Sequence, residues 1–451
     1  MPFDGALLGP STASDRAWAE VDDTAWLQAM LDVEAALAAA AADTGLVPRP
    51  AAEAVASCCR SDRFDLVDLG RRAAEAGNPV IPLVAALRAA VPTEARSAVH
   101  VGATSQDVID TSLMLLAKRS LARVDNELDR ASSAAATLAE RHRGDVAVGR
   151  TLGQHAVPIT FGLTAATWLV GLVDARALAA RVATERLAVQ LGGAAGTLAP
   201  LGDAGPAVVE QLAARLGLVA PPLPWQTTRA RTAELASALA IVAGNLGRVA
   251  TDVVALARTE IGEVQEGSSG GSSAMPHKRN PVRATLVVSA AHQVTGLASI
   301  VLGAQLQELQ RAAGPWHAEW EPLRTGLALT AGAAERMADL LGDLEIDVER
   351  MRSNLELTGG LIMTEAVVTA LVERGVDPTR AREAVEAAAG VVLAGKGSLA
   401  DALAADPLVA GALDAEALAR ALEPAEHFGA ADAFIDHALS HAHAHESRGN
   451  P

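Results

Sequence analysis

A stretch of 41 residues without glycine or proline, from Ala103 to Arg143, limits the possible folds of this chain more than any other feature. Glycine and proline are the residues that most readily end helices, so their absence over this distance favours one continuous helix. At ~1.5 Å per residue such a helix is about 60 Å long, well beyond the usual length in globular proteins. The stretch therefore predicts a bundle of long helices or a coiled coil.

The rest of the chain is also typical of helix, because alanine and leucine dominate and β-branched alternation is nearly absent. The segment Asp23–Asp43 has apolar residues at spacings of three and four and stops at Gly45, as a helix normally does. Glycines inside the predicted helices, including Gly162, Gly244 and Gly247, are expected where a neighbouring backbone comes close. Further long helices are predicted at about 156–190, 227–264, 282–313 and 323–345.

The predicted fold class is therefore all-α, an elongated central bundle of long helices flanked by smaller helical domains. The expected division is a helical domain over residues 1–100, the bundle over 101–350, and a helical domain over 351–451. The bundle includes a loop at 266–281, and the last domain ends in a histidine-rich tail.

The net charge of the chain disfavours some classes of function. With 54 acidic and 37 basic residues its formal charge is −17, which disfavours a nucleic-acid binder because such proteins need a basic surface. An anionic substrate would need local positive charge at its site. Cys58 and Cys59 are adjacent and suit a reducing compartment. Without a secretory signal pattern or a run of 18 uncharged apolar residues, we expect a cytoplasmic protein without nucleic-acid or membrane partners.

The loop from Glu266 to Pro281 carries the most chemistry. Its sequence, EGSSGGSSAMPHKRNP, contains three glycines and two prolines, so it is not regular helix. Serine hydroxyls beside glycines allow close approach of a substrate, and successive backbone N–H groups can bind an anion. Lys278, Arg279 and Asn280 add two cations and an amide. The combination suits a carboxylate whose negative charge grows during a reaction, although a solvated linker with a basic cluster has the same composition.

Three blocks of this sequence resemble the signature segments of the fumarase/aspartase superfamily. GSSAMPHKRNP, at 271–281, fits the superfamily pattern GSSxMPxKxNP, and HVGATSQD, at 100–107, and GRTLGQHA, at 149–156, fit the other two. The resemblance covers roughly residues 20–370. It implies an all-α homotetramer without a cofactor, in which each active site is built from the three blocks of three different subunits.

Within the superfamily the chain is most similar to the bacterial 3-carboxy-cis,cis-muconate cycloisomerases, through GATSQDVIDTSL, QHAVPITFGL, PLPWQTTRARTAELASALA and PWHAEWEPLR. Most other lyases of the superfamily have a histidine after the threonine of the second block, where it assists the leaving group; here that position is Leu152. Adenylosuccinate lyases also tend to have a glutamate at the position of Thr285.

The resemblance implies reversible closure of 3-carboxy-cis,cis-muconate to 4-carboxymuconolactone, in the protocatechuate branch of the β-ketoadipate pathway. The group that adds or leaves is a carboxylate, with a reference pKa near ~4, which departs as a stable anion without an acid. Leu152 therefore replaces an acid that this reaction does not need.

The same resemblance assigns roles to the blocks. Ser272 is the expected general base on the α-hydrogen of the lactone, and Lys278 and Asn280 are expected to stabilise the dianion that follows. His155 and His100 are further catalytic candidates, as proton donors or carboxylate partners. The expected ligands of the other substrate carboxylates are Thr104, Ser105, Thr151, Gln154 and Arg311.

Several candidates also have a structural interpretation. Thr104 and Ser105 are placed to cap the long helix, which is compatible with substrate binding. His155 and His100 also fit histidines packed among helices, and Arg311 fits a structural ion pair.

The chain departs from the cycloisomerase pattern at Gln226, Ala230 and Gln310, where histidine, aspartate and glutamate are usual. These changes are expected to leave Arg229 and Arg231 without one acidic neighbour, and they put the substrate in question. The alternatives are an adenylosuccinate lyase-like or other β-elimination enzyme, and a catalytically silent structural protein of the same fold. No metal site is expected, although the tail has histidines at spacings that can bind a divalent metal: His437, His441, His443 and His445.

Overall fold

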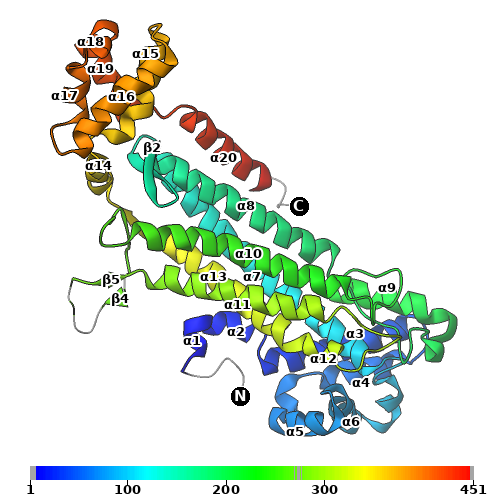
Figure 1. Ribbon diagram of the computed structural model, residues 1–451. Helices are drawn as coiled ribbons and strands as arrows, with labels where there is room; N and C mark the ends of the chain where they lie inside the picture. Colours follow the sequence, from blue (N-terminus) through cyan, green and yellow to red (C-terminus); the bar gives the residue numbers. More distant parts are fainter. Residues whose placement is uncertain (1–6, 269, 272–274, 276, 447–451) are drawn as a thin grey trace. The chain divides into compact units, whose positions relative to one another are not determined.

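The computed structural model describes residues 7–268, 270–271, 275 and 277–446. It is all-α, as predicted, and the strands in this part of the chain form only short two-stranded ladders (Figure 1). Residue contacts group the chain into two compact units. Unit 1 contains residues 1–129, 174–250 and 284–337, and unit 2 contains residues 130–173, 251–283 and 338–451. The three-domain division with boundaries near 100 and 350 stays a prediction.

The stretch without glycine and proline forms α7 (Ser105–Arg141), a helix of 37 residues. The other long helices are α8 (Phe161–Glu185), α10 (Ala230–Leu256), α11 (Val282–Gly303) and α13 (Trp320–Gly342). Helices α8, α10 and α11 are shorter than the predicted ranges, whereas α13 has the predicted length but begins and ends three residues earlier. Residues 156–160 were predicted as helix but belong to strand β2 (Gln154–Thr160), and the helix that follows begins at Phe161. The largest excess is at residues 304–313, because α11 already ends at Gly303.

In unit 1 the N-terminal helices build one apolar cluster. Helix α3 (Asp23–Asp43) begins after Asp22, whose carboxylate accepts a hydrogen bond from the Ala25 N–H, and it packs against α4 (Arg49–Cys58) and α9 (Gly205–Leu216). Helices α5 (Leu66–Ala76) and α6 (Val80–Ala90) pack on each other beside α4 (Figure 1). Cys58 and Cys59 are buried free thiols in this cluster.

In unit 2 the C-terminal helices form a second cluster. Short helices, most of them capped by an aspartate or serine, surround an apolar core to which strand β1 (Val146–Thr151) contributes Val146 and Val148. The elements are α14 (Val348–Glu356), α15 (Thr364–Glu373), α16 (Pro378–Leu393), α17 (Leu399–Ala404), α18 (Pro407–Ala412) and α19 (Ala415–Ala421), followed by α20 (Ala431–Glu446).

The glycines inside long helices are only partly explained by close packing. A Cβ atom at Gly162 would lie 2.6 Å from the Ala139 carbonyl oxygen, and one at Gly247 would lie 2.7 Å from the Ala291 Cβ, so both positions require glycine. A Cβ atom at Gly244 would have no described atom within 4 Å apart from its own stretch of helix. Within a single chain, close approach of a neighbouring backbone therefore does not explain this glycine.

Four described helical segments are long and apolar enough, by length and composition alone, to cross a membrane. None of the four contains a run of 18 uncharged apolar residues, because polar or charged residues interrupt each segment. Parts of all four segments are buried in the protein itself, least of all in α11. The segments are Asp15–Asp43, α8, α10 and α11.

Candidate active site

The first block ends at the start of α7, in unit 1, and is held there by Asp107. The Asp107 carboxylate accepts hydrogen bonds from the backbone N–H groups of Thr104, Gly192 and Gly193, at 2.8 to 3.0 Å, and from Nε2 of Gln190 at 3.1 Å. The bond from the Thr104 N–H to the side chain three residues later is one of the two hydrogen bonds that define a capping box at a helix N-terminus. Burial raises the pKa of Asp107 to about 6, although the four donors oppose this shift.

Thr104 directly precedes α7, but its hydroxyl accepts its hydrogen bond from Nη2 of Arg311, at 2.8 Å. Nε of Arg311 also donates to Oε1 of Gln106, at 3.2 Å. Two predicted ligands, Thr104 and Arg311, are therefore side by side. Ser105 is the first residue of α7 and is half-buried. Gln106 was not predicted as part of the site.

His100 is held by a carboxylate that the sequence did not indicate. Nδ1 of His100 lies 2.6 Å from Oε1 of Glu34, and the His100 backbone N–H donates to Oε2 of the same residue at 2.9 Å. Glu34 comes from α3 and is fully buried. This contact engages Nδ1 of His100 and fixes the orientation of the imidazole ring. His100 also has a φ of 61°, uncommon for a residue with a side chain.

The second block is a β-hairpin in unit 2, formed by β1 (Val146–Thr151) and β2 (Gln154–Thr160). Its turn consists of Leu152 and Gly153, with φ values of 51° and 78°. Two positive φ values are the type I′ pattern, which matches the natural twist of a hairpin. The predicted ligands Thr151 and Gln154 flank the turn as exposed residues, and Leu152 is 103% exposed.

His155 lies opposite Arg150 across the hairpin and is half-buried. Its Nδ1 is buried and has no hydrogen-bond partner among the described residues. Burial, with the Arg150 guanidinium, lowers the pKa of His155, and the Glu263 carboxylate opposes the shift. A neutral imidazole suits proton exchange better than a fixed positive charge does.

Arg150 makes a two-pronged ion pair with Glu263, with N–O distances of 2.9 and 2.6 Å. Nδ2 of Asn354, in α14, donates to the same carboxylate at 2.7 Å. Glu263 is buried and directly precedes β3 (Val264–Glu266), the strand that leads into the 266–281 loop. The hairpin is thus fixed to the segment where that loop begins.

The third block is a loop closed by a short ladder in unit 2. β4 (Gly270–Gly271) pairs with β5 (Arg279–Asn280) in antiparallel register. Lys278 is exposed and Asn280 is half-buried. Ser272, the predicted general base, lies outside the described residues.

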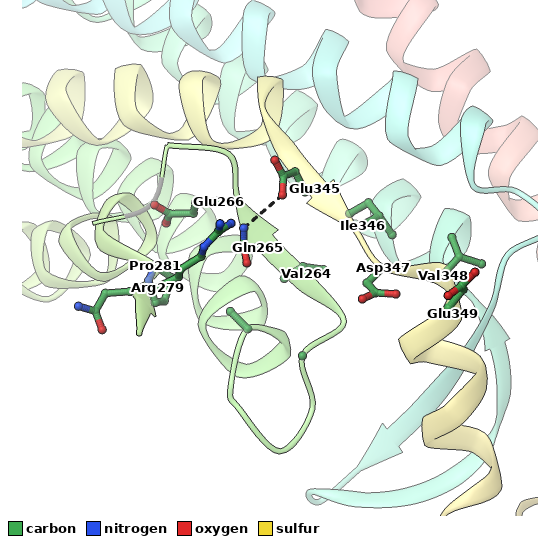
Figure 2. A pocket seen from close by; sticks show the side chains of 13 residues that line it. Val264, Gln265, Glu266, Arg279, Pro281, Glu345, Ile346, Asp347, Val348 and Glu349 are labelled. Carbon is green, nitrogen blue, oxygen red and sulfur yellow. Dashed lines mark hydrogen bonds between the residues drawn. The ribbon is translucent and has the colours of Figure 1, made fainter. Parts of the chain in front are cut away.

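A cavity of about 510 Å³ lies at the base of this loop, next to the ladder of β3 and β6 (Leu344–Ile346) (Figure 2). Nε2 of Gln265 donates to Glu345 across this ladder at 3.2 Å (Figure 2). Among the lining residues, Arg279 is the cation and four are carboxylates, so this cavity does not by itself suit a polyanion. The carboxylates are Glu266, Glu345, Asp347 and Glu349.

Within the described residues, some of the predicted site residues contact one another directly. Thr104, Ser105 and Arg311 adjoin in unit 1, with His100 in the same block. The hairpin and the loop both belong to unit 2, yet within the described residues no hydrogen bond joins a predicted hairpin residue to Lys278 or Asn280.

The structure shows what surrounds two of the positions near these departures. Arg229 has two acidic partners, because it is buried in an ion-paired cluster with Asp110 and Glu319. Its acidic neighbours come from α7 and from the residue before α13, so position 230 is not needed for them. Gln226 is buried, and its Nε2 donates to the Gly193 carbonyl oxygen at 2.9 Å.

Comparison with known proteins agrees with this architecture. A family model described as a lyase matches residues 10–296, and one described as the adenylosuccinate lyase C-terminus matches residues 360–438. The fold and the blocks, with these matches, define an enzyme of the lyase type. The chain belongs to the fumarase/aspartase superfamily.

Its relatives match it along nearly the whole length. A 3-carboxy-cis,cis-muconate cycloisomerase of Bradyrhizobium diazoefficiens is 45% identical over 96% of this chain and 97% of its own. A nitrosuccinate lyase of Streptomyces davaonensis is 44% identical over 97% of this chain and 94% of its own. The crystal structure of a 3-carboxy-cis,cis-muconate lactonizing enzyme from Pseudomonas putida has a TM-score of 0.93 at 39% identity, and covers 98% of this chain and 100% of its own.

Proposed function

We propose that this enzyme is a 3-carboxy-cis,cis-muconate cycloisomerase, which interconverts that tricarboxylate and 4-carboxymuconolactone in the protocatechuate branch of the β-ketoadipate pathway. The relatives and solved structure of that name, alike over the full length, support this function. Within the site, the supporting observation is Leu152, a fully exposed side chain at the tip of the hairpin. It cannot donate a proton, which suits a leaving group that departs as a stable anion.

The proposed step balances without a cofactor. When the lactone ring opens, Ser272 removes the proton from the carbon next to a carboxylate. The negative charge then spreads onto that carboxylate, which lies beside Lys278 and Asn280. The electron pair then forms a carbon–carbon double bond while the ring C–O bond breaks. The departing group is a carboxylate, which needs no acid. In the closing direction a carboxylate oxygen adds to the conjugated carbon and the proton returns.

The remaining candidates complete this proposal. Thr104, Ser105, Thr151, Gln154 and Arg311 bind the other carboxylates, and His100 and His155 exchange protons or contact a carboxylate. The Arg311–Thr104 contact and the carboxylate behind His100 support roles for block 1.

We also infer a cytoplasmic homotetramer with composite sites. Helix α11 supports the assembly, since its Val282, Ile300 and Leu302 are exposed apolar residues and Leu306 and Leu309 follow in the next segment. Other copies of the chain would cover this surface. The anionic cavity at the loop also needs cations from elsewhere to bind a tricarboxylate.

A second candidate is the elimination of nitrite from nitrosuccinate, favoured by the relative that is 44% identical. Nitrite also leaves as a stable anion, so Leu152 is compatible with either reaction. A third candidate is an adenylosuccinate lyase-like reaction, favoured by the match at residues 360–438.

One set of assays separates these candidates. The purified enzyme is mixed separately with 3-carboxy-cis,cis-muconate, nitrosuccinate and adenylosuccinate. Ultraviolet absorbance follows the first and third, and colorimetric detection of nitrite follows the second. Turnover of the muconate that Ser272→Ala abolishes supports the cycloisomerase. Turnover of only one of the others supports that lyase, and inactivity on all three supports a silent protein.

A further inference from the structure

A buried charge cluster lies directly beneath the first block. Arg229 donates through Nη1 and Nη2 to the two oxygens of Asp110, at 2.7 and 3.1 Å, and through Nη2 to Glu319 at 2.5 Å. The side chains of all three residues are at most 1% exposed. Nε1 of Trp316 also donates to Asp110, at 3.0 Å. Because separating Arg229 from the two carboxylates would leave buried charges unpaired, the cluster is a rigid support.

Gln106 connects this cluster to the surface. It is fully buried in the first turn of α7. Its Nε2 donates to the Asp110 carboxylate at 3.2 Å and to the Gln226 carbonyl oxygen at 2.7 Å. An amide NH₂ has two hydrogens, so both are used, and the amide oxygen is left for Arg311.

Arg311 is the exposed end of the hydrogen-bonded series that runs from the cluster through Gln106. Its Nε donates to Oε1 of Gln106 and its Nη2 donates to the hydroxyl of Thr104. Within the described residues its Nη1 makes no hydrogen bond. The contacts fix the plane of the guanidinium, and a fixed guanidinium plane is what two-pronged carboxylate binding requires.

We propose that Gln106 is a positioning residue, which holds Arg311 in the orientation that binds a substrate carboxylate by linking it to the cluster of Asp110, Arg229 and Glu319. This inference rests on the proposed role of Arg311 in substrate binding. Gln106 itself does not touch the substrate, and its contribution passes through the guanidinium.

The test is a double-mutant cycle. Gln106→Met keeps the approximate length and volume of the side chain and removes both of its hydrogen-bonding functions. It is expected to raise KM for 3-carboxy-cis,cis-muconate by about 10-fold with little change in kcat, because the lost interaction is the same in the ground and transition states. Arg311→Met is expected to raise KM further. In the double variant, Gln106→Met should add less than about 2-fold to the effect of Arg311→Met. Independent effects that multiply would overturn the proposal.

Ser112→Ala is the matched control. Ser112 is also fully buried in α7, and its hydroxyl donates to the Val108 carbonyl oxygen at 2.6 Å within the same helix. A KM unchanged in this control ties the effect to the bonds of Gln106. An equal rise in KM in the control would show a general effect on α7 and would overturn the positioning role.

Arg311→Lys covers the case in which Gln106→Met does not fold. Arg311 is exposed, so this change leaves the buried cluster intact. Lysine keeps the charge but has no fork that reaches Gln106 and Thr104 together. A KM raised by about 10-fold supports the proposal, and a KM equal to that of the wild type overturns it.

The proposed function can fail separately. If the wild type does not turn over the muconate, propane-1,2,3-tricarboxylate is titrated into the same variants by calorimetry. Weaker binding by Gln106→Met and Arg311→Lys than by the wild type and Ser112→Ala would support the positioning role. Equal affinity in all four proteins would overturn it.

Discussion

The Asp107 carboxylate joins two segments that are more than eighty residues apart in the sequence, the turn before α7 and the chain at Gly192 and Gly193. Its four hydrogen bonds stabilise the ionised form, while burial opposes it and raises the pKa of the group to about 6. The same carboxylate that fixes the backbone of the first block is therefore costly to ionise.

This has a predictable effect on stability. The folded-state pKa of Asp107, about 6, lies above the unfolded value of 3.8, so the folded protein binds the proton more tightly. The stabilising contribution of protonation is complete below pH 3.8 and is lost as the pH rises through about 6. The loss is about 3 kcal/mol at ~1.4 kcal/mol per pKa unit.

Asp107→Asn removes this titration. Urea unfolding of both proteins from pH 4 to pH 7 is expected to show the wild type losing stability relative to the variant across this range. A difference in unfolding free energy that is constant with pH would contradict the raised pKa.

Leu152 offers a second test at a single position. Its φ of 51° is tolerated better by histidine than by a branched residue, and its side chain is fully exposed, so Leu152→His is expected to fold normally. The added acid has no use when a carboxylate leaves. Cycloisomerisation by the variant should be equal to or slower than that of the parent in an ultraviolet assay, and a faster rate would disprove the interpretation of this position.

Among the elements, the hairpin of β1 and β2 depends on one buried ion pair. Glu263 is 1% exposed at its side chain and Arg150 is 17% exposed, and the pair fixes the hairpin to the start of the loop segment. Removing either partner leaves the other charge unpaired, and the cost rises with the burial of the charge that remains.

Arg150→Met is therefore expected to destabilise the protein by about 3 to 5 kcal/mol, and Glu263→Gln by less, because the Arg150 that it leaves is nearer to solvent. Both are also expected to lower activity, since the hairpin carries Thr151, Gln154 and His155. Urea unfolding with steady-state kinetics measures both effects. Arg420→Met, which breaks an exposed pair with Glu416, is the control and should cost less than about 1 kcal/mol. Equal costs for all three variants would contradict the buried-pair argument.

Helices could be predicted from the sequence where glycine or proline marks their ends. The interval from Ala103 to Arg143 predicted α7 closely, and Asp23–Asp43 is a helix over the predicted residues. The hairpin was missed because its strands are short and lie next to a long helix. A signal was present in Gly153, a turn-favouring glycine with Val146 and Val148 before it and Val157 and Ile159 after it.

In the molecule as a whole, the three blocks are spread over both units and part of the apolar surface of α11 is exposed. Both observations fit an active site completed by other copies of the chain. The sequence located the blocks through the superfamily resemblance. It could not show Glu34 behind His100 or Gln106 beneath Arg311, because such contacts join residues 66 and 205 positions apart.

Composite sites make a testable prediction for mixed oligomers. Ser272→Ala and His155→Ala each disable a different block, so each variant alone is expected to be inactive. When the two are co-expressed, about a quarter of the sites should combine an intact loop from one chain with an intact hairpin from another. Activity of the mixture, with light scattering for its mass, checks this. An inactive mixture of correct mass would place both blocks of a site in the same chain.

The carboxylates that surround the cavity at the loop have a consequence for how fast substrate arrives. A trianion approaching Glu266, Glu345, Asp347 and Glu349 on a chain of net charge −17 is repelled until it reaches the fixed cations. Dissolved ions weaken that long-range repulsion more than they weaken the short contacts inside the site. Moderate salt should therefore speed capture of the muconate, the reverse of what is seen in enzymes that draw their substrates in by opposite charge.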